Sequence, residues 1–128
     1  MNKKLIFVVH EHHATHLHWD LRLEMDGALK SWAVPKEPPT GIGIRRLAIQ
    51  VEDHPLDYAN FEGEIPEGEY GAGMVEIWDK GTYEEKYINA KKIEVIIHGK
   101  RLNGGYVLLK FPKAGPKAWL FFKTRKQN

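Results

Sequence analysis

The sequence predicts an all-β fold: a compact, closed or nearly closed β-barrel with little helix and one concave wall. Apolar and polar residues alternate in many short segments, which is the two-residue period of a β-strand. Turns rich in glycine and proline separate these segments at nearly regular spacing, and no long amphipathic helix is visible. Many short strands of this kind are typical of a β-barrel or a β-sandwich. A barrel also explains why one strand carries a polar face, because an inward-facing site can lie at its mouth or along a concave wall.

Length and composition indicate one soluble domain covering residues 1–128. A chain of 128 residues is long enough for one hydrophobic core but not for two. The net charge of only +2 means that any basic surface is local, so composition alone does not indicate a nucleic-acid-binding protein. The absence of cysteine excludes disulfides and thiolate metal sites. The apolar run at residues 5–9 is too short for a signal peptide or a membrane span, and we expect a cytoplasmic protein without membrane contact.

The first half of the chain contains the clearest strand pattern. Asp26-Gly27 is a two-residue hairpin turn between two alternating segments. A proline-rich stretch at residues 35–41 breaks regular structure and is expected to form a surface loop. His54-Pro55 ends the next strand, because proline restricts the preceding residue and has no amide hydrogen to donate. The strands expected in this half cover residues 5–9, 17–25, 28–34 and 47–53.

Turns that contain glycine and proline separate the expected strands in the second half of the chain as well. Residues 61–73 contain four glycines and one proline and predict a loop with tight turns, which lacks the Lys-Ser/Thr ending of a phosphate-binding P-loop. Residues 79–81 are expected to form a turn, and residues 84–91 are the only place where the pattern allows a helical turn. All four tryptophans occupy apolar strand positions and are expected in the core. The strands expected here cover residues 74–78, 82–87, 92–98, 105–111 and 118–123, with a turn at residues 112–117.

The stretch from His10 to Glu24 carries the strongest indication of a site. Five of the seven histidines lie between His10 and His18. From His18 onward polar and apolar residues alternate, so a strand gathers its polar residues on one face. That face holds His18, Asp20, Arg22 and Glu24. Solvated surface side chains are the competing interpretation, and the regular alternation argues against it.

Three residues of this stretch suit a metal. His12 precedes His18 by six residues, so a short bend between them can bring the two rings together. Two imidazoles and the carboxylate of Asp20 suit Mn²⁺, Fe²⁺ or Zn²⁺. Three protein ligands leave coordination positions open for water or substrate, as a catalytic site requires. Arg22, on the same face, can hold an anion beside the metal.

A second group of residues can serve the same site. Glu52 and His54 have the same strand parity, and Tyr58 follows after a proline has turned the chain. His54 can bind a phosphate oxygen or deliver a proton, because the pKa of histidine is ordinarily about 6.5. Tyr58 can donate a hydrogen bond to the same oxygen. Two simpler interpretations stay open, in which His54 caps the strand end and Tyr58 packs in the core.

Basic residues flank the proline-rich loop. Lys36 lies within it, and Arg45 and Arg46 precede the next strand. Together with Arg22 they can form a local cationic pocket suited to a phosphate ester. Taken singly, each is as well explained by a solvated charge.

Three long motifs in order make the sequence resemble one family. The runs HHATHLHWDLRLEMDGALKSWAVPK, RLAIQVEDHPLDY and FEGEIPEGEYGAGMVEIWDKGTY are similar to the 3′-phosphoesterase module of bacterial non-homologous end-joining ligase D, of which free-standing versions occur in archaea and bacteria. The resemblance covers essentially residues 5–124. It implies a compact β-barrel with a Mn²⁺-dependent active site in a crescent-shaped groove. It also implies removal of a terminal 3′-ribonucleotide to leave a 3′-phosphate, followed by hydrolysis of that phosphate to a 3′-hydroxyl.

The resemblance assigns roles to residues of this sequence. The family's metal ligands, which belong to its catalytic set, fall on His12, His18 and Asp20. Its phosphate-contacting and catalytic residues fall on Arg22, Lys36, Arg46, His54 and Tyr58, and Glu52 matches a supporting acidic position of the catalytic set. The family commonly has glutamine where this sequence has His10, from which we expect an added metal or phosphate contact. An N-terminal arm precedes the first motif in the fused enzymes, and its absence here is expected to change the balance between nuclease and phosphatase activity.

The resemblance also implies the cofactor and the partners. Mn²⁺ is the expected metal, with Co²⁺ or Zn²⁺ as substitutes. The expected substrate is a primer-template duplex that ends in a 3′-ribonucleotide or a 3′-phosphate, in DNA repair. A separate DNA ligase or polymerase is an expected partner of a chain that we expect to be monomeric.

From the residues alone, two other functions stay open. His18, Asp20 and His54 match the two-histidine, one-carboxylate set of non-haem Fe(II) oxygenases, although the Arg and Lys residues then have no role. A non-catalytic nucleic-acid-binding barrel, with the histidines holding a structural metal, is the third hypothesis.

Overall fold

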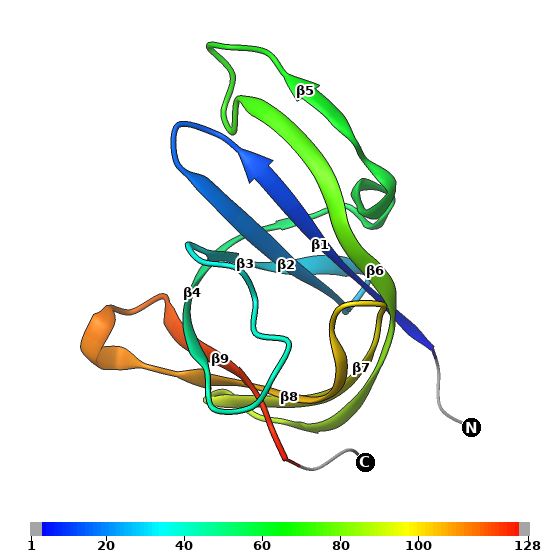
Figure 1. Cartoon of the computed structure of the whole chain (residues 1–128), viewed down its shortest axis with the longest axis vertical. Coiled ribbons are helices and arrows are strands. Elements are labelled where there is room, and N and C mark those ends of the chain that lie inside the picture. The colour runs from blue at the N-terminus through cyan, green and yellow to red at the C-terminus, as the bar shows by residue number, and fades with distance from the viewer. Residues whose placement is uncertain (1–3, 126–128) are drawn as a thin grey trace.

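The computed structural model describes residues 4–125, which form an antiparallel β-barrel with two short 3₁₀ helices (Figure 1). The predicted all-β class and the low helix content are therefore confirmed. The strands are β1 (Leu5–His13), β2 (Leu17–Met25), β3 (Ala28–Val34), β4 (Arg45–His54), β5 (Gly63–Ile65), β6 (Gly73–Ile88), β7 (Lys92–His98), β8 (Asn103–Lys110) and β9 (Ala118–Lys123). The 3₁₀ helices are η1 (Leu56–Asn60) and η2 (Pro112–Ala114). No helix within residues 4–125 is long and apolar enough to cross a membrane.

The sheet closes through its first strand. The strand order is β1-β2-β3-β4-β9-β8-β7-β6-β5, and β1 also pairs with β6, so eight strands form the barrel wall. The long strand β6 pairs with β1 at residues 74–83, with β5 at residues 73–75 and with β7 at residues 82–88. The β1–β2 hairpin, the start of β6 and β5 therefore extend the wall beyond the barrel at one end of the molecule (Figure 1).

The barrel interior is an apolar core to which every wall strand contributes. Phe7, Leu21, Trp32 and Phe121 are at most 1% exposed. The expected burial of the tryptophans is confirmed: Trp32, Trp78 and Trp119 are buried, and Trp19 packs against the same cluster. The expected polarity of β2 is also confirmed, because its alternate residues Trp19, Leu21 and Leu23 belong to or pack against this core.

The polar face of β2 lies on the outside of the barrel wall. Val8, Leu29 and Ala59 form a second, small cluster on that outer face, where η1 covers β1 and β3. Phe7 and Val9 face the interior, so His10, one residue further along β1, shares the outer face with Val8. The expectation of an inward-facing site is therefore wrong, because large apolar side chains fill the interior.

Three local predictions fail for one reason, which is long-range pairing. Residues 79–81 do not turn; they continue β6 past an irregularity at Trp78, which has no partner in β1. The carboxylate of Asp79 instead accepts hydrogen bonds from the backbone amides of residues 80, 100, 101 and 102. Residues 84–88 pair with β7 and are not helical; the helical turn forms at residues 56–60 instead. The predicted loop at residues 61–73 contains the short strand β5.

Candidate active site

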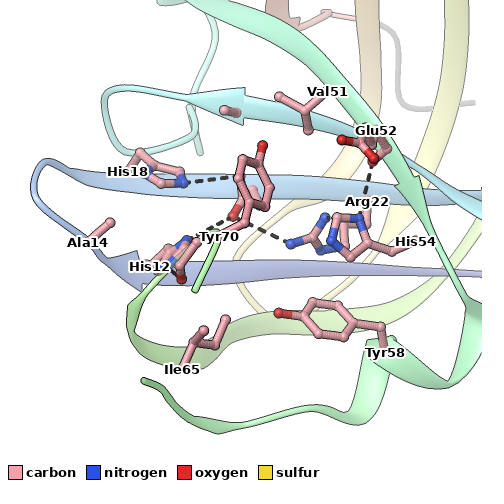
Figure 2. Close-up of a pocket in the computed structure, with 13 residues that line it drawn as sticks. His12, Ala14, His18, Arg22, Val51, Glu52, His54, Tyr58, Ile65 and Tyr70 are labelled. Atoms are coloured by element: carbon pink, nitrogen blue, oxygen red, sulfur yellow. Dashed lines mark hydrogen bonds and ion pairs between the residues drawn. The ribbon is translucent and has the colours of Figure 1, made fainter. Parts of the chain in front are cut away.

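A pocket of about 340 Å³ opens on the outer face of the wall. Its lining comes from the β1–β2 hairpin, from β3, β4, β5 and η1, and from the loop between β5 and β6. Figure 2 shows His12 and His18 at one end of this pocket and Arg22, His54 and Tyr58 toward the other. The volume is in the range of small-ligand sites.

His12, His18 and Asp20 come together as predicted. The hairpin register places His12 directly opposite His18, and the two ring centroids are 4.8 Å apart. Nδ1 of His12 lies 3.5 Å from Oδ2 of Asp20, and Nε2 of His18 lies 3.3 Å from Oδ1. One ligand atom from each of the three residues lies within 4.8 Å of the others.

Backbone carbonyls orient both rings toward the carboxylate. Nε2 of His12 lies 2.7 Å from the carbonyl oxygen of Gly71, and Nδ1 of His18 lies 3.1 Å from that of His16. The nitrogen of each ring that faces a carbonyl donates its hydrogen there. The nitrogen that faces Asp20 donates to the carboxylate when it carries a hydrogen and is available to a metal when it does not. Metal-binding histidines are held in this way in proteins, and the N₂O donor set suits a divalent transition metal.

The charges of the cluster support a ligating carboxylate. Burial of Asp20 opposes its charged form, but hydrogen bonds from His12 and His18 and the charge of Arg22 hold the pKa of this carboxyl well below its usual range. The hydrogen bond to Asp20 raises the pKa of His18, although burial opposes this shift. Asp20 is therefore a carboxylate at neutral pH, as a metal ligand must be.

Arg22 is buried beside this cluster and is bonded on several sides. Its Nε donates to Nδ1 of His10 at 3.0 Å, and its Nη1 donates to Oγ of Ser31 at 2.9 Å. Nη1 also lies 3.1 Å from Nδ1 of His54, and Nη2 lies 3.4 Å from Oδ2 of Asp20. A guanidinium held in this way has one fixed orientation, which is the arrangement expected for an anion-binding arginine.

His10 lies beneath Arg22 and does not line the pocket. Its side chain is fully buried, and its Nε2 lies 3.1 Å from the carbonyl oxygen of Phe61. Burial, reinforced by the charge of Arg22, lowers the pKa of His10 to about 4. The neutral ring therefore accepts from Arg22 and donates to Phe61. The metal or phosphate contact expected of His10 does not fit this position, which instead suits a residue that positions Arg22.

A β-bulge brings His54 to the pocket. Ser31 pairs with Val51 and Leu29 pairs with His54, so β4 has one residue more than β3 between these pairs. Without the extra residue His54 would share a face with Gln50, whose side chain accepts a hydrogen bond from the core residue Trp119. Regular alternation along β4 would therefore have turned His54 toward the barrel interior. The bulge turns it to the outer face, beside Arg22.

His54 and Tyr58 form one side of the pocket. Their ring centroids are 4.7 Å apart, and the guanidinium of Arg22 lies 5.0 Å from the centroid of Tyr58. Burial, and then the charge of Arg22, lower the pKa of His54, so this ring is neutral at pH 7. Burial raises the pKa of Tyr58, so its phenol keeps its proton. Both residues can donate hydrogen bonds to an anion.

The remaining predicted residues are placed differently. Glu52 is exposed and lines the pocket rim. Lys36 is exposed, and Nε of Arg46 donates to the carbonyl oxygen of Glu37 at 2.7 Å; neither residue lines the pocket. The structure therefore does not bring Lys36 and Arg46 together with Arg22.

Sequence reasoning missed several contributors. Ser31 could have been found, because the Asp26-Gly27 turn fixes the register that places it opposite Arg22. The carbonyl oxygens of Gly71 and Phe61 lie 59 and 51 residues from the histidines that they orient, and no local pattern reveals such contacts.

Comparison with known proteins gives a consistent result. The family described as the DNA Ligase D 3′-phosphoesterase domain matches residues 10–110. The multifunctional non-homologous end joining DNA repair protein LigD of Mycobacterium tuberculosis is 49% identical over 126 residues, which cover 95% of this chain and 16% of that protein. The multifunctional non-homologous end joining protein LigD of Pseudomonas aeruginosa is 43% identical over 127 residues, covering 94% of this chain and 15% of that protein. The chain thus spans about one sixth of the length of these relatives.

Proposed function

This chain belongs to the DNA ligase D 3′-phosphoesterase domain family, and from that premise we propose that it is a metal-dependent enzyme that processes the 3′ ends of DNA strands. Two reactions are proposed: hydrolysis of the phosphodiester that joins a terminal ribonucleotide, and hydrolysis of a 3′-phosphate to a 3′-hydroxyl. Ends restored in this way would be substrates for a separate DNA ligase or polymerase in end joining.

One observation carries the proposal. Two histidine nitrogens and a carboxylate converge within 4.8 Å, and a buried arginine is fixed next to them. Metal ligands beside an oriented cation match the needs of phosphoryl transfer, in which negative charge on the phosphate oxygens must be stabilised. The open rim of the pocket at Glu52 gives a strand end access to these groups.

Mn²⁺ is the proposed metal, and His12, His18 and Asp20 would hold it. When bound, such a metal supplies Lewis acidity at a phosphate oxygen. The N₂O donor set and the orienting carbonyls of Gly71 and His16 support this assignment. Co²⁺ and Zn²⁺ suit the same donors.

The other residues of the site have distinct roles in this proposal. Arg22 supplies permanent positive charge to the phosphate. The neutral ring of His54 and the phenol of Tyr58 donate hydrogen bonds to phosphate oxygens. His10 and Ser31 hold Arg22 in orientation. Lys36 and Arg46 lie outside the pocket, so a phosphate that they contact would belong to a more distant nucleotide.

The test is an end-processing assay. The full chain is incubated with Mn²⁺ and a duplex whose primer ends in a 3′-phosphate or a 3′-ribonucleotide. We expect shortening of the ribonucleotide-ended primer and release of phosphate, both stopped by EDTA. His18→Ala is expected to reduce both rates by more than about 100-fold, because loss of even an outer partner of a metal ligand costs 10- to 100-fold.

His16→Ala is the matched control for this assay. His16 is an exposed histidine in the same hairpin, and only its backbone carbonyl contributes to the site. Its variant should keep the wild-type rates. Full turnover by His18→Ala, or binding of the duplex with no processing by the wild type, would refute the proposal; the second result would favour a passive binding module.

The oxygenase hypothesis lacks its ligand set. Within residues 4–125 the ligand atoms of two groups converge, His12, His18 and Asp20 in the pocket and Glu11, His13 and Glu76 elsewhere, and neither group includes His54.

A further inference from the structure

Tyr70 is an aromatic side chain at the pocket that the proposed chemistry does not use. Among the large hydrophobic side chains of residues 4–125 it is the most exposed, at 85%, and Tyr87 follows at 51%. It makes no hydrogen bond or ring contact with any residue in that range. Yet Tyr70 lines the same pocket as His18, Asp20 and Arg22, and Figure 2 shows its ring between the histidine end and the arginine end.

The backbone next to Tyr70 is tied to one of the proposed metal ligands, His12. The carbonyl oxygen of Gly71 is the partner of Nε2 of His12. A Cβ atom at Gly71 would meet Cε1 of His12 at 3.6 Å and Cδ1 of Ile65 at 3.9 Å, so this glycine packs against both side chains. Two further backbone hydrogen bonds, from Glu69 to Pro66 and from Ala72 to Glu69, shape the loop. The loop backbone that carries Tyr70 is thus held beside the site.

The pocket has two chemically different parts. Arg22, His54 and Tyr58 offer charge and hydrogen-bond donors, which suit a phosphate. Ala14, Ile65 and the ring of Tyr70 offer apolar surface next to His12. A nucleotide has the same division between a charged phosphate and a flat apolar base. Free aromatic rings beside basic grooves bind nucleic-acid bases by stacking, with little dependence on base identity.

We infer that Tyr70 stacks on the base of the 3′-terminal nucleotide and that Ile65 supports the same base. This inference rests on the proposed function, since it assigns the part of the substrate that lies beyond the phosphate. If Tyr70 stacks in this way, the pocket binds a 3′ end that carries a base more tightly than a bare phosphoester or an abasic end. Such stacking makes Tyr70 a residue for affinity and specificity, with no part in metal binding.

The test compares two oligonucleotides that differ only in the terminal base. One ends in a thymidine 3′-phosphate and the other in an abasic residue with the same 3′-phosphate. Dissociation constants are measured by fluorescence polarisation in EDTA, so that turnover does not interfere. We expect the wild-type chain to bind the base-bearing end about 5- to 150-fold more tightly, the range that one base–aromatic stack provides.

Three variants separate stacking from other roles. Tyr70→Ala should bind both oligonucleotides equally, at the wild-type affinity for the abasic one. Tyr70→Phe keeps the ring and should keep the discrimination. Tyr87→Ala removes the next most exposed tyrosine, which lies on β6 beside Lys92, and should behave as the wild type. Discrimination that persists in Tyr70→Ala, or that is absent from the wild type, would overturn the inference.

A parallel assay with Mn²⁺ separates this inference from the proposed function. Phosphate release from the abasic oligonucleotide should be the same for the wild type and Tyr70→Ala, because that substrate has no base to stack. If the wild type releases phosphate from neither oligonucleotide, the proposed function fails while the binding comparison still decides the role of Tyr70. A tenfold loss of release from the abasic substrate in Tyr70→Ala would instead place Tyr70 in the chemistry and contradict the inference.

Discussion

Arg22 fixes the tautomer of His10. Its Nε can only donate, so the neutral ring of His10 accepts with Nδ1 and carries its hydrogen on Nε2, where it bonds the carbonyl oxygen of Phe61. His54 differs, because its Nδ1 lies 3.1 Å both from Nη1 of Arg22, a donor, and from the carbonyl oxygen of Glu52, an acceptor. The lowered pKa of each histidine keeps its ring neutral near pH 7.

A prediction at the residue scale concerns His10. His10→Leu leaves Nε of Arg22 without its partner, and a lost hydrogen bond to a buried charged group costs about 1.5–3 kcal/mol. We expect kcat/KM for a 3′-phosphate end to fall about 10- to 100-fold, with little change in the Mn²⁺ dissociation constant measured by calorimetry.

His10→Gln is the matched variant. An amide can accept from Arg22 with its oxygen and donate to Phe61 with its nitrogen, so this variant should retain activity. Equal activity of His10→Leu and the wild type would show that Arg22 needs no such support. A large loss of metal affinity in His10→Leu would place His10 with the ligands and not with Arg22.

At the scale of single elements, the hairpins were the most predictable parts. Residues 17–25, 28–34, 92–98 and 118–123 form strands with the expected bounds. For each of these strands, the alternation of polar and apolar residues and a neighbouring turn are both visible in the local sequence. The placement of Ser31 follows from one such hairpin. The pairing of His12 with His18 needs β1 to continue to His13, beyond the end expected at residue 9.

The elements that were predicted wrongly depend on pairing with residues far away in the sequence. Asp-Lys-Gly at residues 79–81 has the composition of a turn, but Gly81 lets the carbonyl of His98 approach to 2.2 Å from where a Cβ would lie. The bulge that redirects His54 shows only in the pairing of β3 with β4. The same holds for the loop contact to His12. The convergence of His12, His18 and Asp20 was therefore predictable, and the contacts that orient the two rings were not.

A prediction at the element scale concerns the start of β6. Gly73 has a φ of +127°, and a Cβ there would lie 2.2 Å from the carbonyl oxygen of His13. Gly73→Ala must therefore displace the loop whose Gly71 carbonyl orients His12. We expect the Mn²⁺ dissociation constant, measured by calorimetry, to rise at least tenfold. Loss of an outer partner of a metal ligand has an effect of this size.

Gly68→Ala is the control in the same loop. Gly68 also has a positive φ, of +91°, but nothing lies within 4 Å of the added Cβ. Its backbone strain of about 1–2 kcal/mol should lower the melting temperature without a comparable loss of metal affinity. Equal metal affinities for the two variants would show that the contact with His13 does not support the site.

For the whole molecule, one buried carboxylate joins distant parts of the barrel. Asp79 of β6 accepts four backbone hydrogen bonds, three of them from residues 100–102 between β7 and β8. Asp79→Ala leaves these donors unpaired, and we expect a loss of about 2–4 kcal/mol in the free energy of unfolding, measured with urea. Glu85→Gln, an exposed change on the same strand, should have almost no effect. A loss of similar size in both variants would contradict this account.

A second prediction for the whole molecule concerns alkaline stability. The hydroxyl of Tyr106 donates to the carbonyl of Pro39 at 2.8 Å, and burial raises the pKa of Tyr106. The unfolded chain loses this proton near pH 10 while the folded chain keeps it, so the contribution is present below pH 10 and falls as pH rises above it. The free energy of unfolding, measured with urea, should decrease as the pH is raised from 9 to 11.5. In the Tyr106→Phe variant the same quantity should decrease less steeply with pH. Identical slopes would contradict the assignment.

The placement of the reactive groups on the outer surface of a closed wall has a consequence for engineering. The large apolar core and the side chains proposed to perform chemistry occupy opposite sides of the same strands, so the two sets can be redesigned separately. Replacing the outward-facing polar residues His12, His18 and Asp20, while keeping Val8 of the small outer cluster, should change the proposed reaction while the barrel still folds. The barrel can in this sense serve as a scaffold on which different sets of functional side chains are placed.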